Sequence, residues 1–116
     1  MKINSFCHIE IPAPDLYKAK IFYEKMFQWK ITIFPDNSYA FFDDGVIGGG
    51  FDPNMPICKG GINLVIAVED INQKLEEIEV AGGSLAKEKT LISEEHGYYA
   101  SFLDPNGVRL SIWCKN

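Results

Sequence analysis

A histidine and a glutamate near the start of the chain are the first residues that could do chemistry. His8 and Glu10 lie two residues apart in a segment where apolar and polar residues alternate. In a strand, this alternation places both on the face opposite Ile9 and Ile11. An imidazole there could contact a ligand, act as a general base near neutral pH, or hydrogen-bond to a neighbour. Glu10 is either a partner for His8 or a solvated charge at the strand end, and we favour the solvated charge.

A second group of polar residues alternates in the last strand, where Arg109, Ser111 and Trp113 share one face. A guanidinium group binds carboxylates and phosphates through paired hydrogen bonds. Arg109 could therefore hold an anionic group of a ligand or, equally, pair with Glu10. The Trp113 indole could stack on a planar ligand or fill a dimer interface. An apolar wall with a few polar anchors is typical of a small-molecule site.

These residues belong to two copies of one sequence pattern. The first copy reads as an alternating strand, a turn with two prolines and a helix that begins at Asp15; the second repeats the strand and the helix, which begins at Asp70. Aligning the two aspartates places His8 on Asn63, since each lies seven residues before its aspartate. A repeat at fixed spacing indicates that the same structural unit occurs twice.

Three further strands follow each helix, so each half is expected to be β-α-β-β-β. The expected strands are 30–34, 39–42 and 46–51 in the first half and 84–87, 98–103 and 108–114 in the second, with a polar loop at 90–96. The second copy is longer by seven residues, which we place in the Glu94–Gly97 loop. His96 in that loop is either solvated or part of a lid.

The last strands of the two halves can also be aligned. Matching the glycines of the turns that precede them places Gly49 on Ser111. The corresponding face of the first half then consists of Ile47, Gly49 and Phe51. Together with the polar face of the last strand, these residues predict an apolar cleft with a few polar anchors.

Composition narrows the functional classes. A chain of 116 residues with 47% hydrophobic and 23% charged residues is typical of one compact globular domain. Its net charge of −5 and scattered lysines argue against nucleic acid as a partner. No segment approaches the ~20 apolar residues of a membrane span. Cys7, Cys58 and Cys114 form no CxxC pair and, without a signal peptide, indicate reduced thiols in the cytoplasm.

The order of these elements resembles the vicinal oxygen chelate superfamily, which includes glyoxalase I, the bleomycin resistance proteins and the extradiol dioxygenases. The resemblance is carried by His8 with Asp15, the FYEKMFQW stretch, the central GGG, the VEDI helix start and YYASFLDPNG. It implies an α+β fold, in which two βαβββ modules with curled mixed sheets form a cleft, and it implies a homodimer. We therefore expect a single glyoxalase-like domain over 1–116, with module one at 5–52, a linker at 53–60 and module two at 61–115.

In the metal-using members of the superfamily, the first and last strands of each module supply one ligand each. The resemblance carries these positions onto His8, Gly49, Asn63 and Ser111. Only His8 is a competent ligand, and a transition metal needs about three or four nitrogen, oxygen or sulfur donors. We therefore expect no metal ligands and no cofactor, with a divalent metal kept as the alternative.

The expected function is the binding of a small organic molecule in the sheet cleft without a metal, with sequestration by bleomycin resistance proteins as the nearest parallel. One alternative is a metal-dependent glyoxalase-like lyase or dioxygenase; another is a metal-free enzyme with His8 as the catalytic base. The expected ligand-binding residues are His8, Ile47, Gly49, Phe51, Asn63, Arg109, Ser111 and Trp113.

Overall fold

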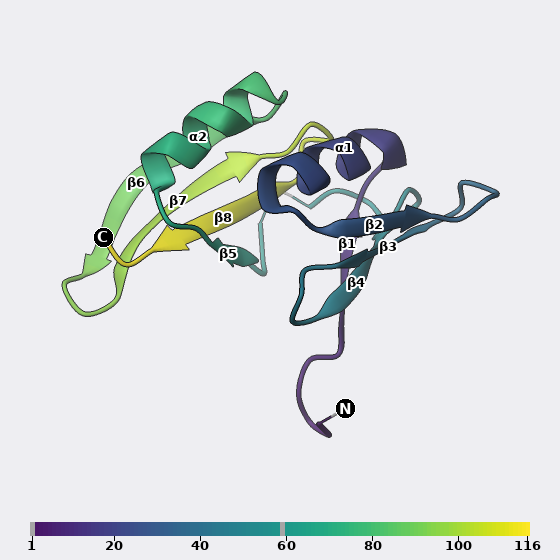
Figure 1. Ribbon diagram of the computed structural model, residues 1–116, viewed down its shortest axis with the longest axis horizontal. Helices are drawn as coiled ribbons and strands as arrows, with labels where there is room; N and C mark the ends of the chain where they lie inside the picture. The colour runs from purple at the N-terminus through teal and green to yellow at the C-terminus, as the bar shows by residue number, and fades with distance from the viewer. Residues whose placement is uncertain (1, 59) are drawn as a thin grey trace. The chain divides into compact units, whose positions relative to one another are not determined.

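The computed structural model describes residues 2–58 and 60–116, which form two compact units (Figure 1). The first unit ends at Ile57 and the second begins at Cys58. One residue of the predicted linker, Lys59, lies outside the described residues. Within the described ranges, no helix is long and apolar enough to cross a membrane.

The first unit has the order β-α-β-β-β. Its elements are β1 (His8–Pro12), α1 (Leu16–Phe27), β2 (Lys30–Ile33), β3 (Ala40–Asp43) and β4 (Gly48–Asp52). The sheet has the strand order β1-β4-β3-β2, in which β1 and β4 are parallel and the other neighbours are antiparallel. Because α1 packs on β2 and β4, one face of this sheet is covered and becomes the core (Figure 1).

The helix α1 begins where the sequence predicts. The Asp15 side chain accepts a hydrogen bond of 3.0 Å from the backbone N–H of Lys18, as expected of an N-cap. The buried face of α1 places Tyr23 against Trp29, whose ring stacks on Phe42 of β3 with the centroids 4.7 Å apart. This aromatic stack joins the helix to the sheet and fixes which sheet face is buried.

The second unit repeats the same plan. Its elements are β5 (Val65–Ala67), α2 (Ile71–Val80), β6 (Ser84–Ser93), β7 (Gly97–Leu103) and β8 (Arg109–Cys114). The strand order β5-β8-β7-β6 is the counterpart of the first sheet, again with one parallel pair. Asp70 caps α2 by accepting from Gln73, and α2 packs on β6, β7 and β8. The predicted α+β fold with two βαβββ modules is confirmed.

The strand β6 is longer than predicted. We expected a strand at 84–87 and a polar loop at 90–96, but β6 continues to Ser93 and pairs with β7 through several register shifts. The loop prediction was wrong because β6 is an edge strand, whose exposed side chains are polar enough to read as a loop. The extra residues of the second half therefore lengthen the β6–β7 hairpin.

Candidate functional site

Each sheet has one face under its helix and one opposite face, which we call the helix-free face. In the first unit, the parallel register pairs His8 with Gly48 and Glu10 with Gly50. Paired residues point to the same face of a sheet. His8 and Glu10 therefore share the helix-free face with Gly48 and Gly50, as their alternation predicts.

Gly49 and Phe51 face α1 instead, so their predicted place on the cleft face is wrong. Phe51 is 0% exposed, and its ring centroid lies 5.2 Å from that of Tyr23 on α1. A Cβ atom on Gly49 would lie 2.4 Å from the Phe42 ring, which belongs to the same core. Ile47 precedes β4 in the turn and is half-buried. These residues build the core of the first unit and its border.

The error comes from a one-residue slip in aligning the two halves. Gly50 pairs with Glu10, and Ser111 pairs with Val65. Glu10 and Val65 each lie five residues before the aspartate that caps the following helix. Gly50, rather than Gly49, is therefore the counterpart of Ser111. A slip of one residue in a strand moves every side chain to the opposite face.

On the helix-free face of the first unit, His8, Glu10 and Tyr39 form a hydrogen-bonded cluster. The Tyr39 hydroxyl donates to the Glu10 carboxylate, while His8 Nε2 lies 2.9 Å from Tyr39 Oη and 3.2 Å from Glu10 Oε2. The phenol has one proton and gives it to the carboxylate, so His8 Nε2 carries its own proton and donates it. The neutral imidazole then keeps its lone pair on Nδ1. Glu10 is a partner of His8, which corrects the expectation of a solvated charge.

These hydrogen bonds shift the pKa values of Glu10 and Tyr39 in opposite directions. The bond from Tyr39 is the main reason that the pKa of Glu10 is lowered from its usual 4.5, and His8 adds to the effect. Burial, followed by the bond to the Glu10 carboxylate, raises the pKa of Tyr39. Near neutral pH the carboxylate is therefore ionised and the phenol is protonated, which maintains the direction of the bond between them.

The cluster predicts an acid-dependent stability difference for Glu10→Gln. A carboxyl group whose pKa is lowered by folding stabilises the folded state above its unfolded pKa, and the contribution is lost as pH falls through the folded value. Glu10→Gln is therefore expected to be less stable than the parent at neutral pH, with the difference shrinking below pH 4.5. Urea unfolding from neutral pH to about pH 3 measures it. The exposed Glu76→Gln serves as control, and a difference for Glu10→Gln that stays constant with pH would contradict the prediction.

In the second unit, Ser101, Ser111 and Asn63 form a chain of hydrogen bonds. The two serine Oγ atoms lie 2.7 Å apart, and Ser111 donates a bond of 2.9 Å to the Asn63 carbonyl oxygen. Because Ser111 uses its proton on Asn63, Ser101 must donate to Ser111. Ser101 and Ser111 are 1% and 0% exposed, whereas Asn63 is exposed. These hydrogen bonds thus lead from the buried sheet to the surface, and the last of them is accepted by the carbonyl oxygen of the Asn63 side chain.

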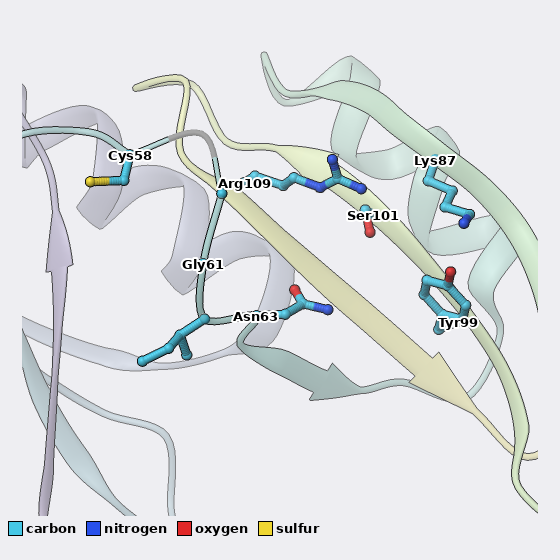
Figure 2. A pocket seen from close by; sticks show the side chains of 9 residues that line it. Cys58, Gly61, Asn63, Lys87, Tyr99, Ser101 and Arg109 are labelled. Atoms are coloured by element: carbon cyan, nitrogen blue, oxygen red, sulfur yellow. The ribbon is translucent and has the colours of Figure 1, made fainter.

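A pocket of about 260 Å³ lies over this chain (Figure 2). The strands contribute Lys87, Tyr99, Ser101 and Arg109 to its lining, and the segment that leads into β5 contributes Cys58, Gly60, Gly61, Ile62 and Asn63. Of the predicted site residues, Asn63 and Arg109 meet here, and Ser111 lies beside Ser101 as its pairing partner on β8. Figure 2 shows the Arg109 side chain pointing toward Ser101 and the Lys87 side chain pointing toward Tyr99.

Trp113 and His96 have other contacts and are not among the lining residues of this pocket. The Trp113 indole N–H donates a bond of 2.6 Å to the backbone carbonyl of His96. His96 Nδ1 lies 2.9 Å from the hydroxyl of Ser93 at the end of β6. The hydrogen bonds of both side chains therefore stabilise the turn of the β6–β7 hairpin.

Tyr39, Lys87 and Tyr99 are site residues that the alternation and the repeat considered above do not single out. The two tyrosines could have been found, because Tyr-Ala-x-Phe occurs at 39–42 and again at 99–102. This short repeat aligns β3 with β7 and marks the tyrosines as counterparts. Lys87 carries no such signal, since its pairing with β7 follows a register shift in β6.

In neither unit do the donor atoms of the described residues fit a transition metal. Among the residues that the structure describes, no three or more His, Cys, Asp or Glu side chains gather where they could hold an ion. In the first unit, the Nε2 atom of His8 and the carboxylate of Glu10 are engaged with Tyr39. In the second unit, the pocket is lined by two cations, Lys87 and Arg109, which would repel a metal ion.

Solved structures share this fold at low sequence identity. A glyoxalase/bleomycin resistance protein/dioxygenase family enzyme from Burkholderia phytofirmans PsJN has a TM-score of 0.77 and 18% identity, over 94% of this chain and 97% of that one. A hypothetical protein from S. aureus has a TM-score of 0.73 and 23% identity, over 97% of each chain. The E126Q mutant of the fosfomycin resistance protein FosX from Listeria monocytogenes, complexed with Mn(II) and 1S,2S-dihydroxypropylphosphonic acid, has a TM-score of 0.76 and 14% identity, over 97% of this chain and 90% of that one.

Comparison with curated protein sequences gives no significant match. The comparison with protein families does give one, and it spans both units. Residues 5–112 match the Glyoxalase/Bleomycin resistance protein/Dioxygenase superfamily, and the chain therefore belongs to this superfamily.

Proposed function

We propose that this protein binds a small organic molecule, without a metal, in the pocket on the helix-free face of the second unit. The observation that carries the proposal is the pocket of about 260 Å³ and its lining from three strands and the segment before β5. Small-molecule sites are concave and combine a few fixed polar groups with apolar walls. Here Asn63 and Arg109 are the polar groups, and Tyr99 and Ile62 are the larger apolar surfaces.

The dimensions of the pocket limit the ligand. One water molecule occupies about 30 Å³ in the liquid, so the pocket has the volume of roughly nine waters. A ligand of roughly nine non-hydrogen atoms would fill it. The hydrogen bonds among Ser101, Ser111 and Asn63 support binding, because they keep the floor of the pocket in place without a ligand.

The proposal predicts binding to protein treated with a chelator. Small aromatic and aliphatic fragments, titrated into isotope-labelled protein in EDTA, are expected to shift the amide signals of residues 60–63, Ser101 and Arg109 in NMR spectra. Asn63→Trp fills the pocket and is expected to weaken binding at least about tenfold. Asn54→Trp, an exposed position in the first unit, is the matched control. Shifts that require added Zn²⁺, Mn²⁺ or Fe²⁺ would favour the metal-dependent alternative, and shifts confined to the first unit would refute this site.

We also propose that the protein is a homodimer and resides in the cytoplasm. Reduced cysteines support the cytoplasm, because Cys7, Cys58 and Cys114 are all free thiols and the first two are exposed. The dimer is proposed from the superfamily alone, and sedimentation at several concentrations tests it.

A further inference from the structure

Two cationic side chains line the pocket of the second unit, in a chain whose net charge is −5. One is Arg109, the single arginine of the sequence, and the other is Lys87. Within the described part of the second unit, neither side chain forms an ion pair with a carboxylate. Lys74, by contrast, pairs with Glu77 on α2 at 3.1 Å. The cations of the pocket are thus available to a ligand.

The strand register brings these two cations to the same site. Lys87 on β6 pairs with Ser101 on β7, and Arg109 lies on β8, the other neighbour of β7. Only one strand separates them, so their backbones are about 10 Å apart across the sheet. In Figure 2, Arg109 points toward Ser101 of β7 and Lys87 toward Tyr99 of β7, with Lys87 Nζ 5.2 Å from the centre of the Tyr99 ring. A group bound over Ser101 would be within reach of both.

The neutral groups of the pocket also present hydrogen-bond donors. Ser111 donates to the carbonyl oxygen of Asn63, which leaves the two amide N–H groups of Asn63 for the pocket. Tyr99 adds a phenolic hydroxyl. Together with the guanidinium of Arg109 and the ammonium of Lys87, these groups give the pocket an excess of donors and a positive charge.

From this arrangement we infer that the ligand is a small organic anion, whose carboxylate, phosphate or phosphonate group lies between Arg109 and Lys87. This inference rests on the proposed function and specifies its ligand class. A guanidinium forms paired, charge-assisted hydrogen bonds with such groups, and the ammonium neutralises the remaining charge. The Asn63 amide and the Tyr99 hydroxyl complete the shell around the anionic oxygens.

The test compares probes that differ in charge and are similar in size. Benzoate and phenylphosphonate carry the anion, benzamide is the neutral analogue of benzoate, and benzylamine is a cation. In calorimetric titrations of the whole protein at low ionic strength, we expect the two anions to bind at least about tenfold more tightly than benzamide. Benzylamine is expected not to bind, and added salt is expected to weaken the binding of the two anions.

The variants separate the role of the pocket from the effect of overall charge. Arg109→Gln and Lys87→Met are each expected to reduce the preference for benzoate over benzamide about tenfold. Lys89→Met removes the same charge from the same strand, at a position outside the pocket lining. This control is expected to leave the preference for benzoate over benzamide unchanged. Arg109 and Lys87 are exposed and Lys89 is half-buried, and circular dichroism should confirm that each variant is folded.

The outcomes distinguish the inference from the function on which it rests. Equal affinity for benzoate and benzamide would overturn the anion assignment and leave the pocket as a binding site. A similar loss in Lys89→Met and Lys87→Met would also overturn it, because overall charge would then explain the preference. Failure of every probe to perturb residues 60–63 or Arg109 would refute both proposals.

Discussion

Gly49→Ala is expected to lower the free energy of unfolding by about 3 kcal/mol. The added Cβ would lie 2.2 Å from the backbone carbonyl oxygen of Ile9 and 2.4 Å from the Phe42 ring. Ile9 belongs to β1, which pairs directly with β4 at this point, so the two strands would have to separate. Phe42 cannot move aside easily, because its ring stacks on Trp29 in the core. Chemical denaturation of the parent and the variant measures the loss.

Gly48→Ala is the matched control, because it makes the same change one residue earlier in the same strand. A Cβ at Gly48 would have the carbonyl oxygen of Phe42 at 3.4 Å as its nearest neighbour, an ordinary contact. We expect this variant to lie within about 0.5 kcal/mol of the parent. If Gly49→Ala were no less stable than Gly48→Ala, the assignment of Gly49 to the helix-packed face would be wrong.

The repeated pattern in the sequence was sufficient to predict the order of helices and strands. Asp15 and Asp70 cap the two helices as expected, and each is preceded by a strand and followed by three more. These features depend on local physics, because capping and alternation are set by neighbouring residues. The order of the elements could therefore be predicted from local patterns, whereas the mixed sheets were expected from the resemblance to the superfamily.

Which face each residue occupies was harder to predict, because it depends on pairing between distant strands. Gly48, Gly49 and Gly50 look identical in sequence, and nothing local marks the middle one as the glycine under α1. The parallel register with β1 decides this, and a shift of one residue reverses the answer. The neighbouring Phe51 was misplaced for the same reason.

The pocket could be predicted only in part. Arg109 and Ser111 were identified from alternation in the last strand, and Asn63 from its alignment with His8. Lys87 comes from an edge strand with bulges, where sequence spacing does not give the partner. Its contribution to the pocket follows from tertiary pairing, so the positive charge of the site became visible only in the structure.

Ser111→Ala is expected to destabilise the protein by about 2 kcal/mol. Ser101 donates its hydroxyl proton to Ser111 and is 1% exposed, so the variant leaves a buried donor without its acceptor. Asn63 also loses the bond that orients its amide, and we expect benzoate to bind more weakly. Urea unfolding measures the first effect, and calorimetric titration measures the second.

A double-mutant cycle tests whether the unsatisfied hydroxyl is the cause. Ser101→Ala alone removes the buried donor while Ser111 keeps its bond to Asn63, so its cost should be about 1 kcal/mol or less. Replacing both serines removes donor and acceptor together, and the double variant should be more stable than the sum of the single effects by about 1 kcal/mol. Strict additivity would mean that Ser101 finds another partner when Ser111 is replaced. The floor of the pocket would then not depend on the hydrogen bond between the two serines.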